Sequence, residues 1–262
     1  MKKYFVIGNP INHSLSPKLH NYWLKENNID AIYDKKKIEE KNLQTIISEV
    51  KEKKINGINV TVPFKRAVIP YLDKLSPEAE QTQSVNTIIL SNDNLVGHNT
   101  DILGFDKAIK NLNFDMRGKK IFILGAGGVV PSIIFALNKM NVSKIVISNR
   151  TKKKAEDLKS KFNNLEILDW GDINDFDVII NATSLGLNKE SINLDFSKFA
   201  NDKLFYDVIY NPAETNFLKE GKRLGNRTEN GKLMFIYQAF EAFKLWHGIE
   251  PQINSNTLKI IK

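Results

Sequence analysis

The chain has no cysteine, few histidines and no long apolar run, and each absence excludes a class of protein. Without cysteine there are no disulfides, no thiolate metal sites and no cysteine nucleophile. The four histidines are scattered along the chain, so we expect no metal site. No apolar stretch approaches the ~20 residues that a membrane-spanning helix needs, and the N-terminus lacks the apolar core of a signal peptide. We therefore expect a cytoplasmic protein with no membrane partner.

Arginine is scarce as well, although the formal net charge is +8. Only five of the 38 basic residues are arginine, which leaves 33 lysines. Proteins that bind nucleic acid favour arginine, because its planar guanidinium forks onto phosphates and base edges. We interpret the lysine clusters at 35–37, 51–54 and 152–154 as solvated helix faces. The composition thus argues against a nucleic-acid partner and suggests a positive field that attracts small anionic molecules.

What the sequence does contain is an alternation of strand-length apolar runs with segments of helical period. With 42% hydrophobic residues, its 262 residues suffice for one large or two modest domains. The alternation predicts an α/β fold with parallel strands. Strands are predicted at 4–7, 55–62, 87–90, 95–98, 120–124, 144–148, 165–168, 177–180 and 204–208. Helices are predicted from an N-cap at Ser16 to about 27, and at 65–72, 129–140, 152–162 and 233–246.

A glycine turn follows the predicted strand at 120–124. Gly125-Ala126-Gly127-Gly128 ends that strand, and a helix begins directly after it. The first glycine permits the sharp turn, and the next lets the backbone approach a pyrophosphate that meets the amides of the helix start. A third fingerprint glycine is missing, since position 130 is Val. Taken alone, the turn is equally compatible with a dinucleotide site and with a purely structural turn.

The next strand favours the dinucleotide reading. An NAD enzyme has an acidic residue there for the ribose 2′-hydroxyl, whereas this chain has Asn149-Arg150-Thr151 followed by three lysines. A guanidinium attracts the 2′-phosphate that a carboxylate would repel. The sequence therefore predicts NADP rather than NAD, and the alternative is an arginine on a solvated helix start.

Polar side chains also stand at turns in the first half of the chain. Ser14 and Ser16 lie near a predicted helix start, which suits a carboxylate, although each also fits a capping or turn role. Lys65 stands at a predicted helix start, where a cation opposes the helix dipole and is unfavourable unless a function requires it. The alternative is that Lys65 is only a surface lysine. Asp101 is alternatively a plain helix-capping acid. Gln238 lies on the apolar side of the last helix, where a buried amide needs a partner.

Taken together, these segments resemble the shikimate dehydrogenase family over essentially the whole chain. The matching segments are GNPINHSLSPKLHN (8–21), NVTVPFK (59–65), VNT (85–87), GHNTD (97–101), the glycine turn, NRT (149–151), NATSLG (181–186), DVIY (207–210) and 234–239. Among the departures, Gln83-Ser84 stands where the family usually has a Gly-Ala pair.

The resemblance implies an NADP-dependent, reversible reduction of 3-dehydroshikimate to shikimate, a step towards chorismate and the aromatic amino acids. It implies a substrate-binding catalytic domain at 1–100, a Rossmann-like, doubly wound NADP-binding domain at 101–235, and a C-terminal helical segment at 236–262 that packs back on the first. We expect a monomer or homodimer. Two alternatives remain: a relative that oxidises quinate or prefers NAD, and a catalytically silent ligand sensor.

Site residues are implied by position in the matching motifs. Lys65 and Asp101 would be catalytic. The substrate would be held by Ser14, Ser16, Thr61, Lys65, Asn86, Asp101, Tyr210 and Gln238. The cofactor would contact Gly125, Ala126, Gly127, Gly128, Val129, Asn149, Arg150, Thr151, Lys154, Val208 and Gly231. We hypothesise that Lys65 stays protonated, polarises the carbonyl and gives up its proton as the oxyanion forms, while Asp101 orients it. The alternative is that Lys65 only binds substrate.

Overall fold

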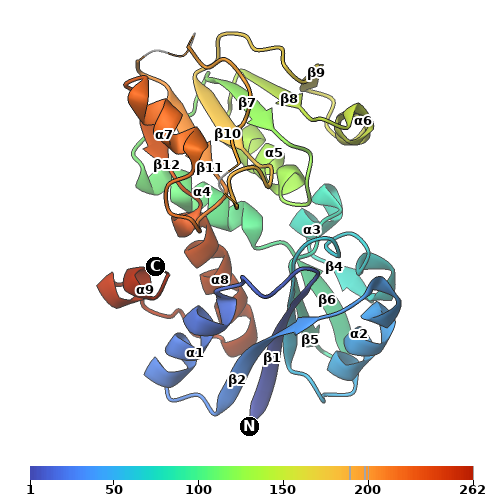
Figure 1. Cartoon of the computed structure of the whole chain (residues 1–262). Coiled ribbons are helices and arrows are strands. Elements are labelled where there is room, and N and C mark those ends of the chain that lie inside the picture. Colours follow the sequence, from blue (N-terminus) through green and yellow to red (C-terminus); the bar gives the residue numbers. More distant parts are fainter. Residues whose placement is uncertain (189, 198, 200, 262) are drawn as a thin grey trace. The chain divides into compact units, whose positions relative to one another are not determined.

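The computed structural model describes residues 1–188, 190–197, 199 and 201–261 and divides the chain into two compact units (Figure 1). Unit 1 comprises Met1–Phe105 and Ile236–Lys262, and unit 2 comprises Asp106–Phe235. The chain passes from one unit to the other within two helices, α4 (Asp101–Asn111) and α8 (Lys232–His247). Each unit contains its own six-stranded sheet.

The sheet of unit 1 is mixed, with the strand order β2-β1-β3-β5-β6-β4. Its strands are β1 (Lys2–Gly8), β2 (Ala31–Lys37), β3 (Gly57–Val60), β4 (Lys74–Leu75), β5 (Thr87–Ser91) and β6 (Asn94–His98). β1, β2 and β3 run parallel to one another, whereas β5 is antiparallel to both β3 and β6. Asn92 and Asp93 form the β5–β6 turn with positive φ angles, as tight hairpin turns require. The hairpin expected from the sequence is therefore present.

The helices of unit 1 differ from the sequence expectations at two places. They are α1 (Ser16–Glu26), α2 (Leu43–Lys51), α3 (Pro77–Thr82) and α9 (Ser255–Ile260), with 3-10 turns η1 (Glu40–Asn42) and η2 (Ile69–Tyr71). Ser16 is the first helical residue of α1 rather than its N-cap, which is Leu15. The helix expected at 65–72 is a series of turns ending in η2, because Pro70 has no N–H to continue a helix.

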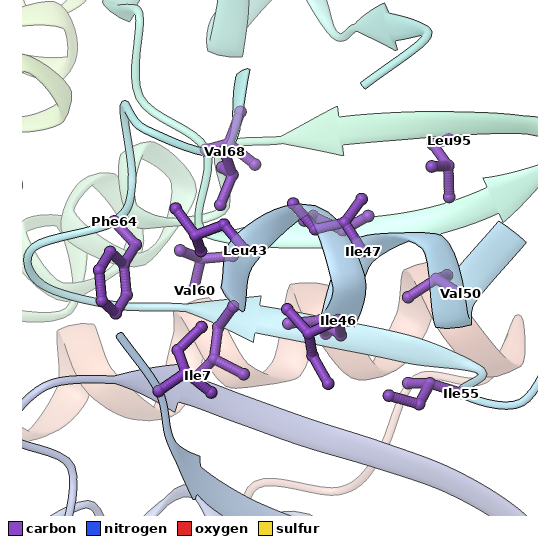
Figure 2. Close-up of a cluster of buried hydrophobic side chains, with 14 of the residues drawn as sticks. Ile7, Leu43, Ile46, Ile47, Val50, Ile55, Val60, Phe64, Val68 and Leu95 are labelled. Carbon is purple, nitrogen blue, oxygen red and sulfur yellow. The ribbon is translucent and has the colours of Figure 1, made fainter. Parts of the chain in front are cut away.

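Several elements of unit 1 were not predicted, namely β2, β4, α2 and α3, and two lysine clusters were misassigned. Of the lysines at 51–54, only Lys51 lies in a helix, at the end of α2. β2 is an edge strand on which the lysines at 35–37 are exposed, so they do not lie on a helix face. Charged side chains are common on edge strands, where they discourage pairing with another chain. α2 buries an apolar face at i, i+3, i+4 and i+7, namely Leu43, Ile46, Ile47 and Val50. In Figure 2 this face packs over side chains of the sheet and completes the core.

The sheet of unit 2 is entirely parallel, with the order β12-β11-β10-β7-β8-β9. Its strands are β7 (Lys120–Leu124), β8 (Lys144–Ser148), β9 (Leu165–Leu168), β10 (Val178–Asn181), β11 (Leu204–Asp207) and β12 (Arg227–Glu229). Its remaining helices are α5 (Val130–Lys139), α6 (Lys152–Lys159) and α7 (Asn216–Arg223). Numbered within the unit, the order is 3-2-1-4-5-6, that of the Rossmann fold. The expected α/β class with a Rossmann-like second sheet is confirmed.

The strand order of unit 2 indicates where a sheet of this kind would bind a ligand. In such sheets the ligand lies at the carboxyl ends of the strands, where the strand order reverses. The reversal here is between β7 and β10, so the glycine turn after β7 lies at that point. Across the described residues, no helix combines the length and the apolar character needed to cross a membrane.

Candidate functional site

Lys65 and Asp101 form a buried ion pair in unit 1. The Lys65 ammonium lies 2.5 Å from Oδ2 of Asp101, and their side chains are only 11% and 8% exposed. Lys65 lies in the turns after β3, where its carbonyl accepts a hydrogen bond from the amide of Val85. Asp101 is the first residue of α4, directly after β6. Two motifs 36 residues apart are thus joined by a pair that is mostly removed from water.

Asn86 fixes the second oxygen of that carboxylate. Its Nδ2 donates to Oδ1 of Asp101 at 2.9 Å and to Oγ1 of Thr100 at 2.9 Å. Its Oδ1 accepts from the amide of Thr100 at 2.8 Å. The Asp101 amide in turn donates to Oδ1 of Asn99 at 3.1 Å. The carboxylate therefore has one oxygen directed at an amide and the other at an ammonium, a geometry that leaves Lys65 little freedom.

The other expected substrate residues of unit 1 lie on neighbouring segments. The Ser14 hydroxyl donates to the Ser16 hydroxyl at 3.2 Å, and the Ser16 amide donates back to Oγ of Ser14 at 3.3 Å. Thr61 follows β3, and its amide donates to the carbonyl of Ile7 in β1. Gln238 lies half-buried in α8. Of the eight expected substrate residues, unit 1 contains seven, and Tyr210 belongs to unit 2.

The glycine turn of unit 2 has a backbone that side chains would obstruct. Gly125 has a φ of +106°, and a Cβ there would lie 2.8 Å from the carbonyl oxygen of Ala182. Gly127 is exposed, and a Cβ added there would lie 3.8 Å from the same oxygen, an ordinary van der Waals contact. α5 begins at Val130, so its first amides follow the turn directly. An open backbone before a helix start fits the pyrophosphate of a dinucleotide.

Asn149 connects this turn to the segment that carries Arg150. Its Oδ1 accepts from the Ala126 amide at 3.1 Å, and its Nδ2 donates to the Thr151 carbonyl at 2.8 Å. The Arg150 and Lys154 side chains are exposed at the end of β8 and in α6. The structure thus places an available guanidinium one residue after the side chain that supports the glycine turn.

Two more expected cofactor residues are in close contact. A Cβ on Gly231 would lie 2.1 Å from the carbonyl oxygen of Val208, and the Gly231 amide donates to the Ile209 carbonyl at 3.1 Å. The ring of Tyr210 stacks on Phe235 at 4.4 Å between centroids. Only glycine fits at 231, because the backbone after β11 packs directly against it.

Asp207 supports the same region, and sequence reasoning named it only as part of a motif. It is completely buried and accepts hydrogen bonds from Thr215 Oγ1 at 2.6 Å, the Ile209 amide at 2.9 Å and Asn181 Nδ2 at 3.1 Å. Burial raises the pKa of Asp207 to about 6. The sequence signal that could have found Asp207 was an acidic residue at the end of an apolar strand, with a threonine at the start of the next helix. Asp207 joins the loops that follow β10 and β11.

Comparisons with known proteins agree with this geometry. Residues 6–88 match the family model of the shikimate dehydrogenase substrate-binding domain, and residues 106–203 match that of shikimate/quinate 5-dehydrogenase. Residues 233–254 match the shikimate 5′-dehydrogenase C-terminal domain. The NADP(+) shikimate dehydrogenase of Pelagibacter ubique is 53% identical over 263 residues, covering 100% of this chain and 99% of that protein. The chain belongs to the shikimate dehydrogenase family.

Solved structures of shikimate dehydrogenases have the same fold. The enzyme of Aquifex aeolicus is 36% identical, with a TM-score of 0.89, 100% of this chain covered and 97% of that one. The enzyme of Thermus thermophilus, solved in complex with NADP(H) and shikimate, is 30% identical, with a TM-score of 0.90 and coverages of 100% and 98%. The family expected from the sequence motifs is thereby confirmed.

Proposed function

We propose that this chain is an NADP-dependent shikimate dehydrogenase that reduces 3-dehydroshikimate reversibly to shikimate, on the route to chorismate and the aromatic amino acids. The observation that supports it best is the buried pair of Lys65 and Asp101, 2.5 Å apart in the unit that matches the substrate-binding domain. A site that reduces a ketone must stabilise a developing oxyanion and deliver a proton, and an ammonium does both.

The two side chains divide this work. NADPH, when bound by the residues of unit 2 named below, would supply the hydride for the carbonyl carbon. The Lys65 ammonium polarises the carbonyl oxygen, and its proton passes to that oxygen as negative charge develops. Asp101 holds the ammonium in position, and Lys65 recovers a proton from solvent. In the reverse direction, neutral Lys65 accepts the hydroxyl proton.

The remaining unit 1 residues hold the substrate. Hydroxyls of Ser14 and Ser16, adjacent at the start of α1, hold its carboxylate, with Tyr210 near the same group. Hydroxyls of the ring are held by Thr61, Asn86, Asp101 and Gln238. The mutual hydrogen bond of the two serines supports this assignment, because a carboxylate accepts from both hydroxyls once that bond opens.

The cofactor is held by main-chain groups and by cations of unit 2. The residues are Gly125, Ala126, Gly127, Gly128, Val129, Asn149, Arg150, Thr151, Lys154, Val208 and Gly231. The open backbone at Gly127 supports pyrophosphate binding, and the exposed guanidinium of Arg150 supports a 2′-phosphate partner. Arg150 is also the reason to prefer NADP over NAD.

A single set of assays tests the function. Purified protein is mixed with shikimate and NADP, with shikimate and NAD, and with quinate and NADP, and nicotinamide absorbance is followed. We expect the first pair to give the highest kcat/KM. Higher turnover with quinate or NAD would indicate the alternative member of the family. Binding of shikimate without any reduction of NADP would indicate a ligand sensor instead.

The proposal includes partners and location. We expect a small-molecule substrate, no nucleic-acid partner, a monomer or homodimer, and the cytoplasm. The excess of lysine over arginine supports the expectation about nucleic acid. Light scattering after gel filtration measures the oligomeric state, a DNA and RNA binding assay tests for nucleic acid, and fractionation of the producing cells measures location.

A further inference from the structure

A row of buried polar side chains lies behind the catalytic pair, in β2, β3 and β5 of unit 1. The Tyr33 hydroxyl donates to Oδ1 of Asn59 at 2.7 Å. Nδ2 of Asn59 donates to the Asn86 carbonyl at 3.0 Å and to Oγ1 of Thr87 at 3.0 Å. Exposure is 2% for Tyr33, 6% for Asn59 and 0% for Thr87. No solvent competes for these bonds.

The row continues to Lys65 without interruption. Oγ1 of Thr87 donates to Oδ1 of Asn86 at 3.1 Å, and Nδ2 of Asn86 donates to Oδ1 of Asp101. Oδ2 of Asp101 then receives the Lys65 ammonium. Asn59 therefore contacts Asn86 twice, once through its backbone carbonyl and once by way of Thr87.

The Tyr33 hydroxyl determines which way the Asn59 amide faces. A backbone carbonyl only accepts hydrogen bonds, so Nδ2 and not Oδ1 must face Asn86. A donor at the opposite end of the amide, supplied by Tyr33, favours this orientation over the flipped one. In a buried network, each correctly oriented dipole strengthens the next bond.

Tyr33 is itself held firmly. Its backbone amide donates to Oδ1 of Asn21 at 2.9 Å, and its carbonyl accepts from Nδ2 of the same residue at 2.7 Å. Its ring stacks on His20, with centroids 4.2 Å apart and an interplanar angle of 3°. A side chain fixed on its ring and on its backbone is a suitable anchor for a hydrogen-bond chain.

We propose that Tyr33 is a positioning residue for the Lys65–Asp101 pair and acts through Asn59 and Thr87. This inference rests on the proposed function of that pair. Tyr33 touches neither Lys65 nor Asp101 through any described contact, so its effect is to fix the direction of the carboxylate. A small misplacement of a reacting group costs much more rate than it costs binding.

Steady-state kinetics of Tyr33→Phe test the inference, since this variant keeps the ring and loses only the hydroxyl. We expect kcat to fall roughly 3- to 10-fold, the range that one lost neutral hydrogen bond supplies. We also expect the midpoint of the pH–kcat profile to shift. A loss of folded protein would scale that profile without moving it. Tyr4→Phe is the matched control, a buried tyrosine of the same unit that makes ring contacts with Trp246 and His247.

Thr87→Val is a second, independent variant that removes the relaying hydroxyl at nearly constant volume. We expect a similar loss in kcat, and less than a further twofold loss when Tyr33→Phe is added, because both act in one chain. These measurements keep the inference testable if Tyr33→Phe does not fold.

The outcomes separate this inference from the proposed function. If the wild-type protein reduces no NADP with shikimate, the proposed function fails. If the wild type is active and Tyr33→Phe matches Tyr4→Phe in kcat and pH profile, the positioning role is overturned. Fully additive losses for Tyr33→Phe and Thr87→Val would also overturn it.

Discussion

The two units build their sites by different means. Unit 1 holds its ion pair with side chains, through Asn86, Thr100 and the row that ends at Tyr33. Unit 2 instead offers backbone, in a glycine turn and a helix start. Proton transfer needs one ammonium fixed in direction, whereas a pyrophosphate is satisfied by peptide amides. Substitutions in unit 1 should therefore affect kcat, and those in the glycine turn should affect cofactor binding or folding.

Lys65→Met should give the largest effect. General acid–base catalysis contributes about 10²- to 10⁴-fold, so we expect kcat to fall at least ~100-fold while KM for NADP stays within about twofold. Initial rates with shikimate and NADP measure both. Lys35→Met, an exposed lysine of β2, is the control. A raised KM for shikimate with unchanged kcat would show that Lys65 binds the substrate and has no catalytic role.

Two alanine substitutions in the glycine turn should separate folding from cofactor binding. Gly125→Ala forces a positive φ and a contact at 2.8 Å with a backbone oxygen, so we expect a loss of about 2–4 kcal/mol in unfolding free energy. Gly127→Ala has space, so the unfolding free energy should change by less than about 1 kcal/mol while KM for NADP rises. Urea unfolding and NADP titration measure these. Equal stability of the two variants would contradict the account of Gly125.

Unit 1 also contains a buried histidine whose protonation opposes folding. Burial, with a further contribution from His247, lowers the pKa of His20 to about 3. Folding therefore disfavours the protonated imidazole. The stability that the neutral His20 contributes is lost as pH falls below 6.5, the pKa of this histidine in the unfolded chain. At pH 4.5 the loss amounts to about 2–3 kcal/mol. His20→Phe should remove it.

Unit-specific hydrogen exchange between pH 7 and pH 4.5 measures this effect on peptides from β1 and β3. Protection in the wild type should fall more steeply than in His20→Phe. The exposed His13→Gln is the control and should behave as wild type. Equal slopes for wild type and His20→Phe would show that His20 does not oppose folding in acid.

Asp207 should make unit 2 respond in the opposite direction. Since burial raises its pKa to about 6, the carboxylate is disfavoured in the fold, and stability is lost as pH rises from 3.8 to 6. Between pH 4 and pH 6 this amounts to about 2 kcal/mol, which Asp207→Asn should abolish. Hydrogen exchange on peptides from β10 and β11 measures it. If amide protection in β10 and β11 falls no more in the wild type than in Asp207→Asn, Asp207 does not make unit 2 less stable as pH rises.

The sequence predicted unit 2 better than unit 1, for a physical reason. Its central strands are buried apolar runs bounded by polar residues, so the bounds predicted at 120–124 and 144–148 match β7 and β8. The bounds at 165–168 also match β9, the edge strand next to β8. β2 is an exposed edge strand without such a run, and Pro70 interrupts the helical pattern at 65–72.

Site residues with a local motif were also easier to name than those without one. The pairing of Lys65 with Asp101 was anticipated through the family resemblance. The row from Tyr33 to Asn86 was not, because its members lie on separate strands and only the sheet register brings them together. Buried polar networks of this kind depend on tertiary structure and leave no periodic trace in the sequence.

The smallest expected effect concerns a positive φ angle that unit 1 assigns to a residue other than glycine. Gln83 ends α3 in the left-handed region at φ +50°, whereas Gly125 in the turn of unit 2 has a φ of +106°. Gln83→Gly should therefore raise the unfolding free energy by about 0.5–1 kcal/mol, measured by urea unfolding. Gln83→Ala is the matched control, because it also loses the bond from Nε2 to the Glu80 carbonyl but keeps a Cβ. If Gln83→Gly proves no more stable than Gln83→Ala, backbone strain at position 83 does not lower the stability of unit 1.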